Sequence, residues 1–477
     1  MRWTQPLVVA ALLASLAACT DDAPTAPLAP RAAPPLPLAS MNPTTARVVG
    51  YFPTYDGAVG KLQLDKLTHV IYSFALPTDS GRLANIPMSG DARLDSLVQR
   101  GHAAGVKVMV SVGGGVDSLD GIFRRVAANA TLRARLVDSI TTFVTNYGLD
   151  GVDIDWEYPT ASDEVGNFGL LMRSLSYQMH SRGKLLTAAV GATWGDAILP
   201  EVQDSVDFLT LMAYALDTAP HSPYSYAADA LDYWLGHGLP ASKAVLGVAF
   251  YGKTSAGAKL AYRELVAGYP QAPYADEVNG YYYNGLTTIQ RKTALALQRG
   301  SGVAIWELSE DTTAAGISLL GAIQEQMNGA TVYADALGGL WEDWSWDVTR
   351  NWAAASPVYA GTKSLAATYT AAWGGVYLFR GTGVSPYLGK IEFYVHGGTA
   401  GGQQLRVQLA DTGGWLTKLP IDSYTAGGSV AAGTWRKVSI PLSSLGVTSN
   451  RITKLVIQDG SGSVQPTFYV DEISFVP

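Results

Sequence analysis

Three carboxylates alternate with apolar residues along the stretch from residue 147 to residue 159. They are Asp153, Asp155 and Glu157, and each is separated from the next by a single residue. Because successive side chains of a β-strand point to opposite faces, the three carboxylates would share one face of a strand. Apolar residues occupy the other face, which predicts a strand buried on both sides rather than a solvated acidic edge.

Carboxyl groups held this close together cannot all ionise freely, so one of them should keep a proton at neutral pH. A protonated carboxyl beside an ionised one is the pair that cleavage of a glycosidic bond uses. A metal site is the competing interpretation, because hard cations bind carboxylate oxygens. No His lies near this stretch, and we expect no metal here and no cofactor for catalysis.

The sequence from residue 46 to residue 328 predicts the framework that positions this strand. Short apolar runs alternate with amphipathic stretches such as Ala92–Ala104, Thr131–Asn146 and Phe168–Ser181. The alternation predicts an α/β fold, a (β/α)8 TIM barrel, with the carboxylates at the carboxyl end of the fourth strand, where barrel active sites lie. An open doubly wound sheet is the alternative, but no Gly-rich dinucleotide turn follows the first run. The predicted strands are Arg47–Phe52, His69–Ala75, Val106–Val112, Gly148–Trp156, Leu185–Ala192, Val206–Tyr214, Ala244–Tyr251 and Val303–Leu308.

From residue 330 to residue 477 the pattern changes to short alternating runs between Gly-Gly turns. These runs predict a second domain, an all-β jelly-roll sandwich, which resembles carbohydrate-binding modules of that kind. The resemblance implies a structural calcium site at Asp335 and Asp471, with ordinary surface acids as the alternative. Some of the Trp residues near its start would be core and others exposed platforms for sugar rings: Trp341, Trp344, Trp346, Trp352 and Trp373.

The N-terminus has the features of an export signal: Arg2, then a short apolar run, then Leu-Ala-Ala-Cys ending at Cys19. That tetrapeptide resembles a bacterial lipobox, in which the Cys becomes the acylated first residue. We therefore expect a signal peptide at residues 1–18, lipidation of Cys19 and a Pro-rich linker at residues 19–45. Ordinary signal cleavage near Ala18 is the alternative. The protein would lie at the cell surface or outer membrane as a lipoprotein, or be secreted.

The net charge of −7 argues against binding to nucleic acid or to anionic lipid. Cys19 is the only cysteine, which excludes a disulfide framework and a cysteine-based zinc site. We expect contact with a membrane only through the lipid anchor, and a monomer.

The acidic stretch, Asp150-Gly-x-Asp153-x-Asp155-x-Glu157, resembles the DGxDxDxE signature of glycoside hydrolase family 18, the chitinases and their relatives. Four further pieces are similar to motifs of that family in the same order along the chain. The resemblance implies a chitinase that hydrolyses β-1,4 bonds in chitin or another polysaccharide of N-acetylglucosamine. The four pieces are Ser111–Gly114, Met212–Tyr214, Phe250–Gly252 and Ile305–Glu307.

The resemblance also implies the roles of individual residues. In this family a glutamate, here Glu157, protonates the leaving oxygen, while the N-acetyl group of the sugar attacks its own anomeric carbon to give an oxazolinium ion. Asp155 would orient the acetamido N–H, Asp153 would share a proton with Asp155, and Tyr214 would donate to the attacking carbonyl oxygen. Substrate-binding roles, with core packing as the alternative for each aromatic residue, are implied for Tyr51, Phe74, Gly114, Met212, Tyr251 and Trp306, the last as the floor under the sugar.

The sequence departs from the family at one position, because Tyr214 is followed by Ala215 where an aspartate is common. Either Asp217 substitutes from a shifted loop, or a polar contact to the sugar is missing. The stretch from Gly252 to Val303 is too short for the α+β insertion of some members, which predicts a shallow groove and endo-type cutting. An endo-β-N-acetylglucosaminidase acting on glycans or peptidoglycan and a chitin-binding lectin remain alternatives, although Glu157 favours an enzyme.

Overall fold

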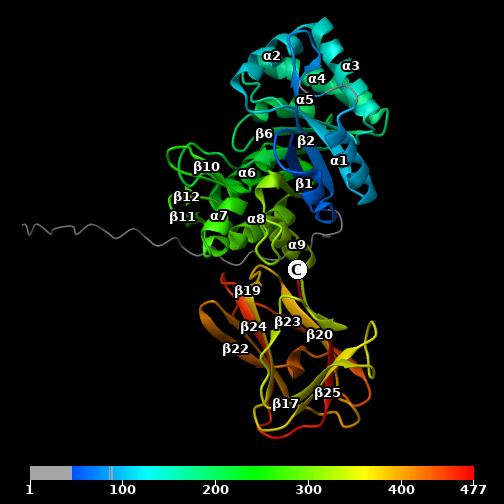
Figure 1. Cartoon of the computed structure of the whole chain (residues 1–477), viewed down its shortest axis with the longest axis vertical. Helices are drawn as coiled ribbons and strands as arrows, with labels where there is room; N and C mark the ends of the chain where they lie inside the picture. Colours follow the sequence, from blue (N-terminus) through cyan, green and yellow to red (C-terminus); the bar gives the residue numbers. More distant parts are fainter. Residues whose placement is uncertain (1–45, 85, 87–89) are drawn as a thin grey trace, which may run out of the picture. The chain divides into compact units, whose positions relative to one another are not determined.

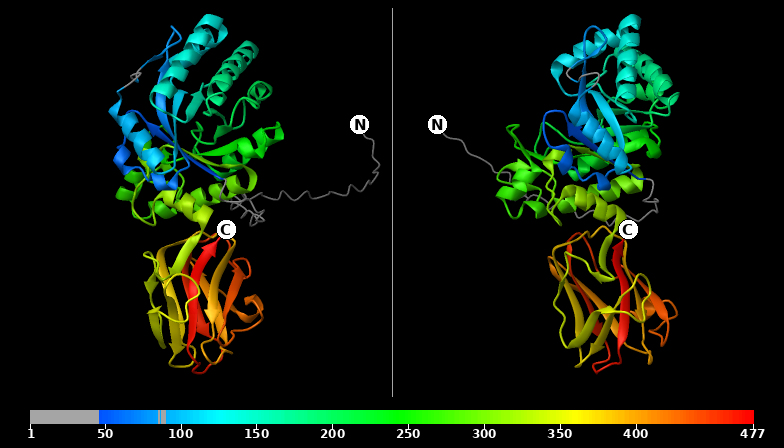
Figure 2. Two further views of the ribbon diagram at one scale, coloured as in Figure 1. Left: turned by 90° about the vertical axis from the view of Figure 1, so that its right-hand side faces the viewer. Right: turned by 45° about the vertical axis from the view of Figure 1, so that its right-hand side comes forward.

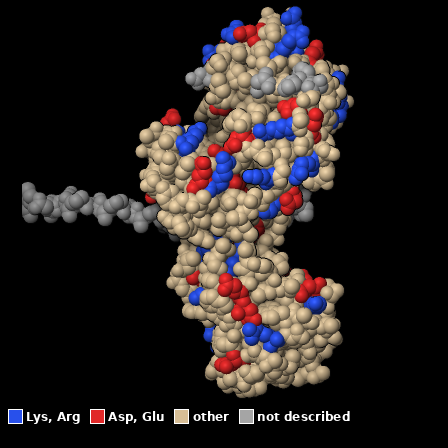
Figure 3. Space-filling view, in the orientation of Figure 1, with Lys and Arg blue, Asp and Glu red and all other residues tan. Residues whose placement is uncertain are grey.

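The computed structural model describes residues 46–84, 86 and 90–477 (Figure 1). The predicted signal peptide, Cys19 and the Pro-rich linker lie outside the described residues. Among the described residues, no helix is both long enough and apolar enough to cross a membrane. Acidic and basic side chains are interspersed on the face of the molecule that Figure 3 shows, so the negative net charge does not form a single-sign surface there.

Within the described part of residues 46–328, eight parallel strands close into a barrel. Their order is β1-β13-β8-β7-β6-β5-β4-β2, and β1 pairs back with β2 to close the sheet. This closed sheet confirms the TIM barrel and rules out the open doubly wound alternative. The strands are β1 (Arg47–Pro53), β2 (His69–Pro77), β4 (Lys107–Gly113), β5 (Gly151–Asp155), β6 (Leu185–Gly191), β7 (Phe208–Met212), β8 (Ala244–Ala249) and β13 (Gly302–Trp306), and the short β3 (Leu83–Ala84) pairs with β2.

Helices surround the barrel strands in both views of Figure 2. The predicted helix at Phe168–Ser181 begins six residues earlier, at Ser162, because Glu164 accepts hydrogen bonds from the backbone N–H groups of Thr160 and Ala161 at 2.9 and 3.0 Å. That polar first turn carries no apolar periodicity. The helices are α1 (Ala92–Ala103), α2 (Asp117–Ala128), α3 (Ala130–Asn146), α4 (Ser162–His180), α5 (Leu199–Val202), α6 (Tyr224–Gly236), α8 (Leu286–Arg299) and α9 (Leu319–Asn328).

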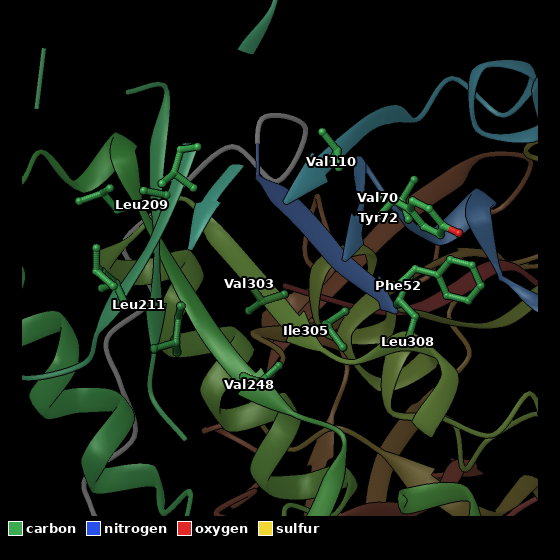
Figure 4. Close-up of a cluster of buried hydrophobic side chains, with 14 of the residues drawn as sticks. Phe52, Val70, Tyr72, Val110, Leu209, Leu211, Val248, Val303, Ile305 and Leu308 are labelled. Atoms are coloured by element: carbon green, nitrogen blue, oxygen red, sulfur yellow. The ribbon is translucent and has the colours of Figure 1, made fainter. Parts of the chain in front are cut away.

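The barrel strands alternate between two apolar clusters, as the period of two requires. In β13, Val303 and Ile305 belong to the large core between strands and helices, whereas Ala304 belongs to a small cluster inside the barrel. Figure 4 shows part of the larger core, including Val248, Leu209 and Leu211 from neighbouring strands. Odd-numbered residues of β5 therefore point into the barrel interior, which places its carboxylates there.

A small α+β unit lies between β8 and α8. It holds an antiparallel sheet in the order β10-β9-β12-β11 and one further helix. The prediction that this stretch is too short for an α+β insertion is wrong, because strands of two or three residues suffice here, and the shallow groove inferred from it loses its basis. The elements are β9 (Tyr251–Lys253), β10 (Lys259–Ala261), α7 (Tyr262–Gly268), β11 (Glu277–Val278) and β12 (Tyr281–Tyr282).

Residues 330–477, all of which are described, form two antiparallel sheets around one core. The all-β prediction is confirmed. The first sheet holds β14 (Ala330–Ala334), β15 (Ala336–Leu337), β17 (Val348–Ala354), β18 (Ser364–Tyr369), β20 (Lys390–His396), β23 (Trp435–Pro441) and β25 (Phe468–Val476). The second holds β16 (Glu342–Asp343), β19 (Gly375–Val384), β21 (Leu405–Asp411), β22 (Gly414–Pro420) and β24 (Ile452–Asp459).

Candidate active site

Asp153 lies at the centre of the barrel, where the neighbouring strands β4 and β6 and the more distant strand β1 each contribute a hydroxyl. It accepts hydrogen bonds from Tyr51 Oη at 3.2 Å, Ser111 Oγ at 2.8 Å and Thr187 Oγ1 at 2.6 Å. Ser111 and Thr187 lie beside Asp153 in the register of β4, β5 and β6. Burial raises the pKa of Asp153, and the three hydrogen bonds oppose that rise. Tyr51 therefore contacts a carboxylate of the site as well as the aromatic group described below.

Asp155 is the last residue of β5, and its carboxyl group is only partly satisfied. The Oδ1 atom is buried and has no hydrogen-bond partner within the described part of the chain. Burial first, and then the charges of Glu157 and Asp153, raise the pKa of Asp155 well above its usual range. An unsatisfied acceptor in this position is free to receive an N–H group from a bound molecule.

Glu157 follows the strand and is half-buried. Burial raises the pKa of its carboxyl group, while a hydrogen bond from Tyr158 and the charge of Lys259 oppose that rise. Gly115 faces it closely, since a Cβ at that position would lie 3.0 Å from Oε1 of Glu157. Glu157 and Asp155 thus form a coupled carboxyl pair in which one member holds a proton more readily than a solvated acid does.

The glycines of the stretch Ser111–Gly114 set the spacing around these acids. Gly113 has φ +125°, and a Cβ there would lie 2.0 Å from the backbone oxygen of Asp155. Gly114 donates its N–H to that same oxygen at 2.9 Å, and a Cβ on it would lie 2.9 Å from the ring of Phe74. Gly114 therefore makes room for Phe74, and its predicted substrate contact remains a prediction.

Three aromatic side chains form one group at the carboxyl ends of β1, β2 and β13. The ring of Trp306 stacks on Phe74 with centroids 5.4 Å apart and planes 22° apart. Tyr51 packs against Trp306 at 5.8 Å. Trp306 and Phe74 are half-buried, whereas Tyr51 is buried. The group supplies a partly open aromatic surface in the barrel mouth.

Tyr214 lies just beyond β7 and is half-buried beside the acids. Burial and then the charge of Asp155 raise the pKa of its phenol well above the usual value, so it remains a hydrogen-bond donor. Met212, at the end of β7, is half-buried. The ring of Tyr251 stacks on His221 with centroids 4.7 Å apart, and Lys259 Nζ lies 5.2 Å from the Tyr251 centroid.

The departure after Tyr214 puts no aspartate in place of the one that is common in the family. Ala215 has φ +65°, and the side chain of Asp217 is fully solvent-exposed, 3.9 Å from Lys253. Of the two alternatives, the structure favours the missing contact over substitution by Asp217.

Sequence reasoning missed several polar residues of the barrel mouth. Glu310 is largely buried, its Oε2 has no hydrogen-bond partner among the described residues, and burial together with Glu307 raises its pKa to about 8. Lys259 comes from the unpredicted α+β unit. Glu310 lies only four residues beyond Trp306, but no spacing rule marks it as part of a site.

The match to a family of known proteins decides the assignment of the barrel. Residues 47–311, more than half of the chain, match the model described as Glycosyl hydrolases family 18. The chain belongs to this family. The family 18 domain is followed by residues 330–477, which match Carbohydrate binding domain 30. Members of family 18 catalyse without a cofactor, and the described residues contain no group of three or more His, Cys, Asp or Glu side chains placed to hold a metal.

Individual relatives of this family 18 chain agree with the assignment. It is 30% identical over 241 residues to a class V chitinase of Arabidopsis thaliana, covering 45% of this chain and 63% of that protein. The solved chitinase ChiB of Flavobacterium johnsoniae is 29% identical with a TM-score of 0.54, covering 60% of this chain and 94% of that one. A chitinase structure from Bacteroides thetaiotaomicron is 26% identical with a TM-score of 0.54, covering 59% and 96%. The chain spans less than two thirds of the curated relatives it matches first.

The calcium prediction falls on two carboxylates that are occupied by backbone groups. Asp335 accepts from the N–H of Thr362 at 2.6 Å and of Lys363 at 2.7 Å, and Asp471 accepts from the N–H of Tyr359 at 2.9 Å. Both carboxylates therefore hold backbone groups of loops, and a structural calcium stays a prediction.

Asp155→Asn should stabilise the family 18 domain at neutral pH. A carboxyl whose pKa is higher in the folded than in the unfolded chain binds more protons when folded, so the free energy of unfolding falls as pH rises above about 4. Asparagine has nearly the same shape and no charge, so we expect Tm to rise by about 2–4 °C at pH 7 and the gain to shrink toward pH 4.

Glu164→Gln is the matched control for the stability measurement. Backbone hydrogen bonds lower the pKa of Glu164, so its replacement should lower Tm at pH 7. Thermal unfolding of the three proteins at several pH values measures both effects. A Tm of Asp155→Asn at or below that of the unmodified protein at pH 7 would show that the buried carboxyl group of Asp155 does not destabilise the fold at that pH.

Proposed function

We propose that the chain is a chitinase that hydrolyses β-1,4 bonds between N-acetylglucosamine units by substrate-assisted, retaining catalysis. The observation that carries the proposal is the pairing of Glu157, a carboxyl with a raised pKa, with Asp155, whose buried Oδ1 has no hydrogen-bond partner among the residues that the structure describes. Both lie at the carboxyl end of a barrel beside the open aromatic surface of Trp306.

In the first step Glu157 donates its proton to the glycosidic oxygen while the acetamido carbonyl oxygen of the same sugar attacks the anomeric carbon. The bond to the leaving sugar breaks with inversion at the anomeric carbon, and a cyclic oxazolinium ion forms, which a second displacement then opens. Oδ1 of Asp155 accepts the acetamido N–H, and Tyr214 donates to the attacking carbonyl oxygen. The contact of Asp155 strengthens as positive charge develops on the acetamide, so it favours the transition state over the substrate. The hydrogen bond from Tyr214 instead orients the carbonyl oxygen for attack on the anomeric carbon.

In the second step Glu157, now ionised, accepts a proton from water as the water attacks the anomeric carbon and opens the ring. The product keeps the β configuration because two inversions occur. The carboxylate of Asp153 accepts hydrogen bonds from three hydroxyls. Its negative charge helps to raise the pKa of Asp155. Trp306 supports the apolar face of the sugar.

A screen of four substrates tests this proposal. We expect release of soluble oligomers from chitin and from the N-acetylglucosamine hexamer, and little release from N-glycosylated protein or peptidoglycan. Cleavage of N-glycans or peptidoglycan alone would instead assign an endo-β-N-acetylglucosaminidase. Tight binding of the hexamer without any cleavage would assign a lectin.

The carbohydrate-binding module has an aromatic strip that suits a polysaccharide chain. Tyr377 and Phe379 of β19 point outward, since Val376 and Leu378, with which they alternate, lie in the core. The Trp344 ring stacks on Phe379 at 4.2 Å, and Tyr377 lies within 5.9 Å of Trp344, Trp346 and Trp415. We call these five residues the aromatic strip.

Some Trp residues of the module are buried and others are exposed, as the sequence predicted. Trp341 is buried and stacks on Phe475, and half-buried Trp352 donates Nε1 to Asp343 at 2.9 Å. Trp344, Trp346 and Trp373 expose between 36% and 52% of their surface, as does Trp415, which the sequence did not single out. The exposed rings support a sugar-binding role for the strip.

Trp415→Ala should weaken binding of the full-length protein to insoluble chitin by about 5- to 10-fold, the loss of roughly one aromatic contact of 1–1.5 kcal/mol. Tyr177→Ala is the matched control, because Tyr177 is an exposed aromatic residue of α4 outside the strip. A pull-down isotherm measures both. Equal binding of Trp415→Ala and the control would remove the strip from chitin recognition.

We also propose that the protein is exported and anchored through an acylated Cys19, with residues 19–45 as a tether. The support is the Leu-Ala-Ala-Cys sequence after a short apolar run. Cys19→Ala should move the enzyme from the membrane fraction to the soluble fraction without changing its kcat on soluble oligomers. Unchanged membrane fractionation of the variant would contradict lipid anchoring.

A further inference from the structure

A lysine of helix α8 is fully buried and is not part of the mechanism above. Lys292 has no exposed surface. Its Nζ donates to the backbone oxygen of Ser222 at 2.7 Å, to Oγ of Ser222 at 2.9 Å and to Oδ1 of Asn284 at 2.8 Å. Three uncharged acceptors thus match the three N–H groups of one ammonium. Burial lowers the pKa of Lys292 to about 7, an effect that the charge of Asp276 opposes.

The residue that Lys292 holds is connected to the chain on the N-terminal side of Tyr214. Ser222 Oγ donates to the backbone oxygen of Ala213 at 3.0 Å. Ala213 lies beyond the end of β7, where the ladder to β8 has ended. Ser222 therefore restrains the backbone immediately before Tyr214.

The residue preceding Ser222 holds the other side of Tyr214. The N–H of Ala215 points to Nδ1 of His221 at 3.4 Å, and the N–H of Leu216 donates to the backbone oxygen of His221 at 3.0 Å. Burial lowers the pKa of His221 to about 4, which leaves Nδ1 free as an acceptor. Ala215 has φ +65°, a left-handed conformation that alanine keeps only where its surroundings hold it.

Both neighbours of Tyr214 are thus restrained by one dipeptide, His221-Ser222, and Lys292 anchors that dipeptide to the barrel helix. We propose that Lys292 is a positioning residue for the reaction, which acts through Ser222 to fix the phenol of Tyr214 in the site. The inference rests on the proposed function, because it gives Tyr214 the role of donor to the acetamido carbonyl. A lysine that only fills the core would affect stability and leave the contribution of Tyr214 unchanged.

A double-mutant cycle on the full-length enzyme separates these roles, with kcat measured on the N-acetylglucosamine tetramer at pH 6, where Lys292 is protonated. We expect Tyr214→Phe to lower kcat by about 100-fold, as misplacement of the attacking carbonyl oxygen does. Lys292→Met should lower kcat by about 10-fold in the unmodified enzyme and by less than about 2-fold in Tyr214→Phe, because residues that act as a unit are not additive.

Ser222→Ala gives a second route that keeps the lysine in place. It removes the link to Ala213 and one of the three acceptors of Lys292, whose Nζ keeps the backbone oxygen of Ser222 and Oδ1 of Asn284, and it should lower kcat by about 10-fold with the same dependence on Tyr214. Leu295→Ala is the matched control, because Leu295 is a buried residue of α8 outside this network. It should lower Tm and leave kcat within about 2-fold at a temperature well below Tm.

The inference would be overturned if Ser222→Ala and Lys292→Met each lowered kcat as much in Tyr214→Phe as in the unmodified enzyme. It would also be overturned if neither variant lowered kcat in the unmodified enzyme. If Tyr214→Phe itself retained full kcat, Lys292 would have no catalytic donor to position and the inference would also fail. The proposed chitinase activity would still be judged separately, because it depends on Glu157 and on cleavage of the unmodified substrate.

Discussion

Glu157→Gln is expected to reduce kcat on soluble N-acetylglucosamine oligomers by about 10²–10⁴-fold or more, the range that general acid catalysis contributes. Glutamine has nearly the same shape but cannot transfer a proton to the glycosidic oxygen. Because Glu157 is half-buried and the substitution keeps its shape, the variant should stay folded and should bind the oligomer with little change in Kd.

Glu164→Gln is the matched control for this substitution, since it makes the same change a few residues further along the chain. Its carboxyl accepts backbone N–H groups at the start of α4, away from the barrel mouth. We expect its kcat to stay within about 2-fold of the unmodified enzyme at a temperature below its Tm. Activity of Glu157→Gln within a few-fold of the unmodified enzyme would show that another group supplies the proton.

Oligomers of glucosamine, which lack the acetyl group, should not be cleaved at all, whatever their affinity. Without the acetamido carbonyl there is no nucleophile for the first step. A thiazoline that mimics the cyclic intermediate should inhibit far more strongly than the substrate binds, because a molecule resembling the intermediate gains the contact of its ring nitrogen with Asp155 at full strength.

Competition assays with the thiazoline and rates on fully acetylated and deacetylated tetramers measure this dependence. The fully acetylated tetramer is the positive control for enzyme integrity. A covalent ester between a sugar and Asp155, detected by mass spectrometry, would replace the substrate nucleophile with an enzyme nucleophile and contradict the proposed mechanism.

The sequence was sufficient for the barrel and for its acids because both depend on local pattern. The period of two in β5 places Asp153 and Asp155 on the interior face without any knowledge of their neighbours. The helix-facing side was equally predictable, since Trp156 packs between Phe123 and Phe168 of two helices. The spacing of carboxylates then restricts the chemistry to a few classes.

The sequence was insufficient where function depends on contacts between distant segments. Lys292 reads as one more polar residue of an amphipathic helix, and its partner Ser222 lies 70 residues away. The sequence alone does not distinguish Trp341 from Trp415, yet the first is buried in the core and the second is exposed. The antiparallel unit after β8 was missed because its strands are too short to show a period.

The configuration of the first product tests the central claim most directly. Proton NMR of the N-acetylglucosamine hexamer during the first minutes of cleavage distinguishes the α and β anomers before mutarotation mixes them. Substrate-assisted, retaining catalysis predicts that the newly formed reducing ends are β. They should be absent with Glu157→Gln, and the thiazoline should suppress them. Initial release of the α anomer would contradict retention through an oxazolinium ion and with it the proposed roles of Asp155, Glu157 and Tyr214.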